Sequence, residues 1–231
     1  YVDSLTGERL AGGHEPPGTL GFLGGCVNVE TRRLRLRPVD STDVDALVFL
    51  DSDPEVMRFV SDGLPTPRAE ISDWVIPRAR AELSTGRGGM WIAIDQRYQA
   101  FLGWVLLRAP RHSQRSEMEL SYRLRRDTWG RGLATEAARA VVGLAFDELH
   151  TERVFASTTL RNSSSRRVME KLGMRVSGVR AGGDHLGRRY EHAHGNRDNL
   201  GELEYELLRH HWEALVMGAD ARRHQVMNLP A

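Results

Sequence analysis

The chain begins its regular pattern with alternating leucine and arginine. Residues 33–38 have the sequence Arg-Leu-Arg-Leu-Arg-Pro, which predicts a half-buried strand that ends at the proline. Asp40, Ser41 and Thr42 supply N-caps for a helix that runs to about Leu50. Asp53-Pro54 marks a turn after it.

The middle and end of the chain alternate helical patterns with short apolar runs. Thr66-Pro67 opens a helix through about Leu83, and Pro77 inside it predicts a kink or a break. The polar segment 96–99 separates two apolar runs and predicts a hairpin. Strands are predicted at 90–95, 101–108, 118–124, 154–158, 174–179 and 203–208, and further helices from 132 to about 149 and between Asn162 and Gly173.

The predicted order β-α-α-β-β-β-α-β-α-β-β indicates an α/β protein in the sense of an α+β mixed sheet flanked by helices, neither a doubly wound sheet nor a barrel. Residues 1–29 contain seven glycines, Pro16 and Pro17 without sustained periodicity, which predicts a flexible extension. One domain over 30–214 follows, and 215–231 is expected to be a C-terminal tail.

Composition excludes several classes of function. The net charge of +1 gives no electrostatic reason to bind nucleic acid or an anionic membrane surface. The single cysteine, Cys26, excludes a disulfide framework, and no apolar run is long enough for a membrane helix. The only lysine, Lys171, is not preceded by the glycines of a P-loop. We expect a soluble, cytoplasmic protein that is a monomer or homodimer.

The segment Trp129-Gly130-Arg131-Gly132 lies between a strand and a long helix. Glycines there let successive N–H groups point outward at a helix N-terminus, where they bind phosphate; the alternative is a simple strand-to-helix turn. A Rossmann site is excluded, because position 135 is threonine and the next strand ends in Ser157-Thr158-Thr159 without an acid.

These residues resemble the GNAT superfamily of N-acetyltransferases. The pyrophosphate loop of that family has the form Gln/Arg-x-x-Gly-x-Gly/Ala, and here it is Trp129-x-x-Gly132-x-Ala134. Tryptophan at the first position is similar to the branch that contains the ribosomal-protein-alanine N-acetyltransferases. The resemblance covers about 31–214 and includes the blocks 31–38, 53–58, 134–137 and 162–173.

The resemblance implies a mostly antiparallel sheet of six to seven strands with about four helices, splayed at its fourth strand, Glu119–Leu124. It also implies acetyl-CoA as cosubstrate, with the pantetheine arm against the splayed strand. An unpaired strand edge is a natural partner for the two pantetheine amides. The cofactor-binding residues implied are Tyr122, Leu124, Trp129, Gly130, Arg131, Gly132, Leu133, Ala134, Thr135 and Asn162.

The same resemblance offers catalytic candidates. Ser165, in the Asn-x-x-Ser block, matches a serine that protonates the leaving thiolate; the alternative is a helical serine bonded to its own backbone. Asp184 matches the position of the general base, and a surface turn is its alternative. Glu119 and His185 are the second and third base candidates.

The remaining candidate side chains give weaker indications of a functional role. His192 and His194 beside Glu191 lack an evident third ligand, so we expect no metal. Arg188 and Arg189 are candidates for an acceptor entrance. The tryptophans Trp74 and Trp212 are expected to be core or rim aromatics.

The function expected is transfer of acetyl from acetyl-CoA directly to a primary amine in a ternary complex. A non-catalytic acyl-CoA-binding or regulatory module on the same fold is the alternative, and a protein-interaction domain is the third. The acceptor stays open among a protein N-terminus, an amino acid, an aminoglycoside and a polyamine. No pronounced acidic cluster is visible in the sequence to favour a polycation.

Overall fold

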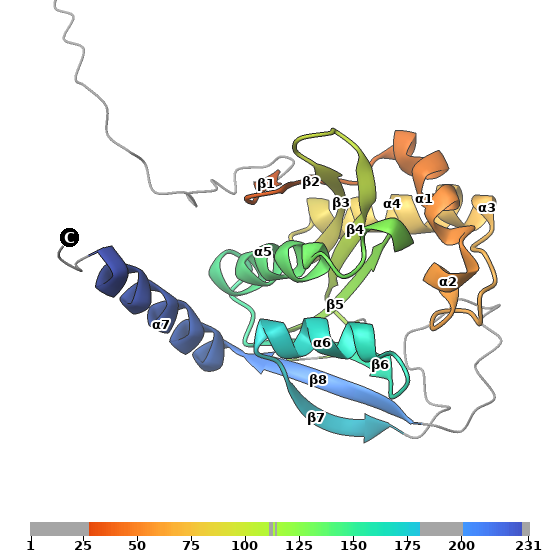
Figure 1. Ribbon diagram of the computed structural model, residues 1–231. Coiled ribbons are helices and arrows are strands. Elements are labelled where there is room, and N and C mark those ends of the chain that lie inside the picture. Colours follow the sequence, from red (N-terminus) through yellow and green to blue (C-terminus); the bar gives the residue numbers. More distant parts are fainter. Residues whose placement is uncertain (1–27, 111–112, 114, 181–200, 228–231) are drawn as a thin grey trace, which may run out of the picture.

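The computed structural model describes residues 28–110, 113, 115–180 and 201–227. Their eight strands form one sheet in the order β1-β2-β3-β4-β5-β6-β8-β7 (Figure 1). Every neighbouring pair is antiparallel except β5 and β6. The strands are β1 Val29–Glu30, β2 Leu34–Pro38, β3 Gly88–Asp95, β4 Phe101–Arg108, β5 Glu117–Leu124, β6 Arg153–Thr159, β7 Arg175–Arg180 and β8 Glu202–Leu208.

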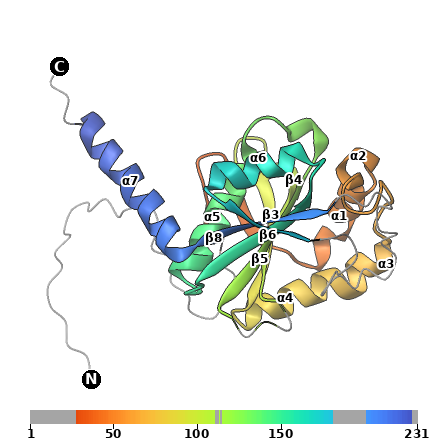
Figure 2. The ribbon, with the colours of Figure 1, turned by 90° about the horizontal axis from the view of Figure 1, so that it is seen from below.

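Helices cover both faces of this sheet, so the described residues form two apolar cores. The larger core packs α5 and α6 against one face, and the smaller packs α1 and α4 against the other, on β3 and β4. Figure 2 shows α6 and α4 on opposite sides of the strands. The helices are α1 Val44–Asp51, α2 Pro54–Met57, α3 Arg68–Glu70, α4 Ile76–Ser84, α5 Leu133–Asp147, α6 Ser163–Leu172 and α7 Arg209–Met227.

The predicted fold class and splayed sheet are confirmed. β5 pairs with β6 only at three residue pairs, which end at Glu119 and Phe155. Beyond that point β5 stays with β4 to Leu124, while β6 stays with β8 to Thr159. The two central strands therefore part like a fork. The described residues hold eight strands rather than the expected six to seven, because the two-residue β1 pairs with β2 at Val29 and Glu30.

Local differences from the sequence prediction have simple causes. Asp40 is the expected N-cap, since its side chain accepts from the Thr42 N–H ahead of a 3-10 turn that leads into α1. Asp53-Pro54, predicted as a turn, begins the one-turn helix α2, because the Asp53 side chain caps the Glu55 N–H. The hairpin of β3 and β4 is as predicted.

The second predicted helix is interrupted at the proline, as expected. Residues Ile71–Val75 form a π turn between α3 and α4, and the Ile76 N–H donates to the Ile71 carbonyl five residues back. Pro77 follows at once and has no N–H to donate, so the bonding pattern changes at this point. Thr66 precedes this helix but does not cap it, because Pro67 is at the N-cap and the Thr66 hydroxyl donates to the Asp51 carboxylate.

The end of the chain contains a helix that the sequence pattern had not predicted. α7 runs through most of the expected tail and extends away from the sheet (Figure 1). Trp212 anchors it, because this side chain is 7% exposed and its ring stacks on Phe146 at 5.8 Å between centroids. Trp212 is thus a core aromatic. The expected flexible segment lies almost wholly in residues 1–27, outside the described residues.

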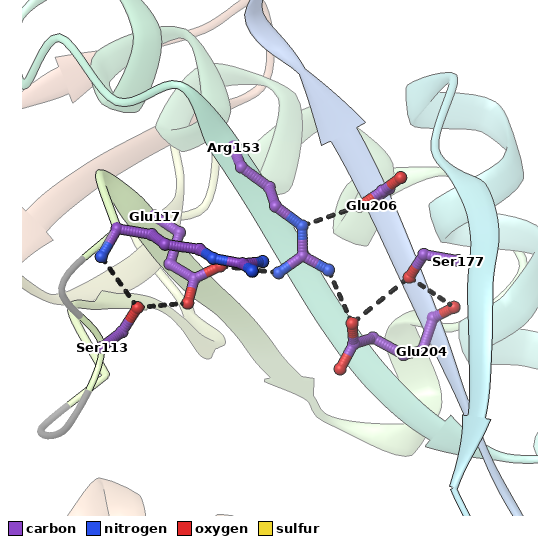
Figure 3. A network of polar contacts seen from close by, with 7 residues as sticks. Ser113, Glu117, Arg153, Ser177, Glu204 and Glu206 are labelled. Atoms are coloured by element: carbon purple, nitrogen blue, oxygen red, sulfur yellow. Dashed lines mark hydrogen bonds and ion pairs between the residues drawn. The ribbon is translucent and has the colours of Figure 1, made fainter.

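One arginine holds the closed end of the fork. Arg153 on β6 donates to Glu117 on β5 at 2.7 Å, and to Glu204 and Glu206 on β8 at 2.6 and 2.7 Å (Figure 3). Burial raises the pKa of Glu117, but the hydrogen bonds from Ser113 and Arg153 together lower it by more. The net shift of this pKa is therefore downward. This network joins three strands where β5 and β6 are still paired.

We expect Arg153→Met to lower the free energy of unfolding by about 3 kcal/mol at pH 7, because three carboxylates lose their common cation. The folded-state pKa of Glu117 is depressed, so its contribution is present above the unfolded pKa and is lost as pH falls. The difference between variant and parent should therefore shrink toward pH 4. Urea unfolding at both pH values measures it.

Arg68→Met is the matched control, because Arg68 pairs with Asp45 at 2.6 Å on the surface, with side chains 60% and 82% exposed. Exposed pairs of this kind contribute little. Equal losses in the two arginine variants, or a loss for Arg153→Met that does not change with pH, would contradict the assignment of this network.

Candidate active site

The N-terminus of α5 is built to receive an anion. Gly130 and Gly132 have φ of +74° and +76°, backbone conformations that side chains other than glycine's rarely adopt. Gly132 is the N-cap of α5 and has no side chain to occupy the helix end. Glu136 makes the first intrahelical bond, to the Gly132 carbonyl at 3.1 Å. The N–H groups of residues 133–135 are left at the positive end of a 15-residue helix, which suits phosphate.

The side chains of this loop have structural roles. The Trp129 indole N–H donates to the Leu124 carbonyl at 2.8 Å and so ties the loop to the end of β5. Leu133 is buried in the larger core, whereas Arg131 is exposed and Ala134 and Thr135 are half-buried. The side chains of Trp129 and Leu133 therefore fix where the backbone of this loop lies.

A contact that sequence reasoning missed holds the loop from the other side. Glu136 accepts from the Thr31 hydroxyl at 2.6 Å, from the Arg33 N–H at 2.8 Å and from the Arg33 Nε at 2.7 Å. Arg33 also donates to the Arg131 carbonyl at 2.9 Å. Burial raises the pKa of Glu136, but these hydrogen bonds outweigh it and lower the pKa overall. A separation of 103 residues between Arg33 and Glu136 hides the contact from local pattern reading.

The open arm of β5 presents backbone donors toward the gap. The Arg125 N–H donates to the Leu102 carbonyl at 2.8 Å, which fixes the alternation of this antiparallel ladder. Tyr122 and Leu124 consequently direct their N–H and C=O groups away from β4, to the side that β6 has left. Among the N–H groups of residues 122–124, those of Tyr122 and Leu124 therefore face the gap, because the Arg123 N–H faces β4.

The gap opens into a cavity of about 230 Å³. Glu119 and Tyr122 of β5 line this cavity, together with Asn162 and Ser165 from the start of α6. Residues from the segment 57–67 and from the α3–α4 region also line it. One cavity therefore brings together candidates that the sequence places more than forty residues apart.

Asn162 and Ser165 form the start of α6 as predicted. The Asn162 Oδ1 accepts from the Ser165 N–H at 3.1 Å, so the capping role is confirmed. The Tyr122 hydroxyl lies 3.0 Å from the Ser165 Oγ and donates to the Ser165 carbonyl at 3.1 Å. Burial of the phenol raises the pKa of Tyr122 to about 12, so it stays neutral at physiological pH.

Of the base candidates, Glu119 lies in the cavity and at the fork itself. Its Oε2 accepts from Arg108 at 2.8 Å, across the β4–β5 pair. Asp184 and His185 lie outside the described residues. So do the entrance candidates Arg188 and Arg189 and the residues Glu191, His192 and His194.

A buried ion pair joins the end of α1 to β5 beside the cavity. Arg123 pairs with Asp51, which also accepts from the Thr66 hydroxyl, and the Arg123 guanidinium lies over the Trp104 ring at 5.1 Å. No local sequence pattern indicates this contact. Trp74 lines the same cavity and is a rim aromatic, as expected.

The described residues contain neither a cluster of metal ligands nor a helix that could span a membrane. Within the part of the chain that the structure describes, no three histidine, cysteine, aspartate or glutamate side chains lie together as metal ligands. None of the helices described there is long and apolar enough to span a membrane.

The geometry matches a known family. The family model described as an acetyltransferase (GNAT) domain matches residues 33–175, more than half of the chain. The chain belongs to the GNAT acetyltransferases, and it is an acyl-CoA-dependent N-acetyltransferase. The fork, the glycine loop and the strand edge fit acetyl-CoA as the acyl donor.

Particular relatives agree with this family. The chain is 36% identical over 148 residues to the uncharacterized protein YkkB of Bacillus subtilis, covering 64% of this chain and 84% of that one. It is 31% identical over 155 residues to an FsC-acetyl coenzyme A-N(2)-transacetylase of Aspergillus fumigatus, covering 63% of this chain and 64% of that one. The ribosomal-protein-S5-alanine acetyltransferase of Vibrio fischeri shares the fold, with a TM-score of 0.63, 14% identity, and coverage of 80% of this chain and 98% of that chain.

We expect Arg33→Ala to weaken CoA binding about tenfold, because the Glu136 carboxylate then faces the phosphates without its counter-charge. Adding Glu136→Gln should restore most of the lost affinity. Isothermal titration with CoA measures both effects.

Pantetheine, which has no phosphate, is the control ligand. Its affinity should not change in either variant. An equal loss for CoA and pantetheine, or no recovery in the double variant, would show that Arg33 does not act on the phosphate site through charge.

Proposed function

We propose that this acetyltransferase moves the acetyl group directly to a primary amine, on a protein N-terminus or a small molecule, in a ternary complex. The observation that supports this most is the shared cavity at the fork. Glu119 lies where β5 and β6 part, and Ser165 lines the same cavity. A proton acceptor and a proton donor are thus available to one reacting centre without a covalent intermediate on the protein.

In this proposal the groups divide the work as follows. The N–H groups of Tyr122 and Leu124 hold the thioester carbonyl oxygen and stabilise the charge that develops on it. Glu119 accepts the proton that the attacking amine loses, directly or through a water. Ser165 donates a hydrogen bond to the sulfur as it leaves. The α5 N-terminus holds the pyrophosphate, and Asn162 contacts the pantetheine arm.

The apolar part of the cavity lining favours a primary amine with an apolar neighbourhood. Apolar side chains such as Met57, Leu64 and Trp104 line the cavity, while Arg108 and Arg123 each pair with a carboxylate. An α-amine has a pKa near about 8 and is partly neutral at pH 7, whereas a lysine amine near about 10.4 is mostly charged. A single carboxylate is therefore sufficient as base for an α-amine.

We expect Glu119→Gln to lower kcat about 100-fold while CoA affinity stays the same, because the variant removes the base and leaves the cofactor contacts. Gly132→Glu should abolish CoA binding, because it places a carboxylate against the pyrophosphate. A screen of peptide N-termini and small amines with acetyl-CoA, followed by mass spectrometry, identifies the acceptor for these measurements.

Glu82→Gln is the matched control, since Glu82 lines the same cavity and pairs with Arg78 at 2.8 Å, the distance of the Arg108–Glu119 pair. Its kcat should stay close to that of the parent. Normal turnover in Glu119→Gln together with loss in Asp184→Asn would assign the base to Asp184. Binding of CoA without acetylation of any amine would contradict catalysis.

A further inference from the structure

We propose that Tyr122 is a positioning residue for Ser165, whose hydroxyl proton it directs toward the leaving sulfur. This inference rests on the proposed function, because it assumes that the sulfur departs beside Ser165. The sequence suggested only a backbone role for Tyr122. The structure adds its side chain, which reaches from the open arm of β5 to the first turn of α6.

The Tyr122 hydroxyl is within hydrogen-bond distance of two atoms of Ser165, its hydroxyl oxygen and its carbonyl oxygen. The Tyr122 hydroxyl oxygen lies 3.0 Å from the Ser165 Oγ and 3.1 Å from the Ser165 carbonyl oxygen. Both residues line the cavity. The serine is itself fixed at the helix start, because its N–H is capped by Asn162. The two hydroxyl groups are therefore already held in contact by the structure.

Counting protons gives two arrangements of this pair. A phenol has one proton, and a hydroxyl group can donate one bond and accept two. When Tyr122 donates to the Ser165 carbonyl, the Ser165 hydroxyl donates back to the phenol oxygen and its proton is engaged. When Tyr122 donates to the Ser165 Oγ, the serine proton is released for a third acceptor in the cavity. Rotation about two C–O bonds converts one arrangement into the other.

The acidity of the phenol makes Tyr122 a partner of the serine rather than the acid itself. Its pKa of about 12 keeps the proton on the oxygen throughout, whereas a thiol with a pKa near about 8.5 is a stable leaving group as thiolate. As the N–C bond forms and the C–S bond breaks, the electron pair goes to sulfur and the amine proton goes to Glu119. Ser165 donates a hydrogen bond to that thiolate and keeps its proton, and Glu119 gives the proton it accepted to solvent after product release.

Tyr205 provides a matched comparison. It is also a buried tyrosine beside α6, since its hydroxyl accepts from Arg166 at 3.2 Å and lies 3.4 Å from Glu170. Unlike Tyr122, it does not line the cavity. Tyr205→Phe removes one buried hydroxyl group from the same helix packing and leaves the pair at Ser165 intact.

The first experiment is a double-mutant cycle of Tyr122→Phe and Ser165→Ala, with kcat, the KM for acetyl-CoA and the melting temperature measured for each protein. We expect each single variant to lower kcat about tenfold, the magnitude of one lost hydrogen bond to a charged group. The double variant should be no slower than Ser165→Ala, and Tyr205→Phe should keep the parent kcat. Additive losses, or a change in KM with kcat intact, would overturn the inference.

The second experiment needs no turnover. At pH 9, where the CoA thiol is largely ionised, isothermal titration gives the ratio of the affinities for CoA and desulfo-CoA. The ratio should fall in Tyr122→Phe as far as it does in Ser165→Ala, and it should stay unchanged in Tyr205→Phe. An unchanged ratio in Tyr122→Phe overturns the positioning role.

The two experiments separate the two proposals. Turnover by the parent with a normal kcat in Tyr122→Phe overturns this inference and leaves the proposed function standing. Absence of turnover by the parent contradicts the proposed function, and the affinity ratio then still decides whether Tyr122 orients the serine hydroxyl toward sulfur.

Discussion

The short pairing of β5 with β6 is the constraint on which the site depends. These strands form the one parallel pair among the described strands, and they stay together for only three residue pairs. Each strand forms a longer ladder on its other side. β5 pairs with β4 as far as Leu124, and β6 pairs with β8 as far as Thr159. Because both outer ladders continue and the inner one stops, the strands separate. The Arg153 network keeps the closed end of the fork together.

The N-termini of α5 and α6 lie at the open end of that fork, and the two helices are capped differently. α6 is capped by the Asn162 side chain, so its first turn is already satisfied and can hold Ser165 in place. α5 starts at Gly132, which has no side chain to act as a cap, so its first N–H groups have no hydrogen-bond partner within the helix. The first turn is thus capped by a side chain in α6 and left with unpaired N–H groups in α5, and the residue at the N-cap makes the difference.

Charges around the cavity are mostly paired within the protein. Glu119 pairs with Arg108, Glu82 pairs with Arg78, and Asp51 pairs with Arg123. The sequence shows no acidic cluster, yet the sheet gathers Glu117, Glu204 and Glu206 around one arginine. Carboxylates distant in sequence can form a cluster because alternate residues of neighbouring strands share a face.

The sequence by itself determined the fold class, most elements and the glycine turn that starts α5. Those features depend on local causes, such as the apolar period of each strand, the Asn162 cap and the glycines that allow positive φ. Tertiary structure alone decided the partners: Arg33 with Glu136, Arg123 with Asp51, and Tyr122 with Ser165. It also decided α7, which Trp212 anchors to the core. Side-chain contacts across tens of residues depend on strand register and helix placement, and no local pattern encodes either.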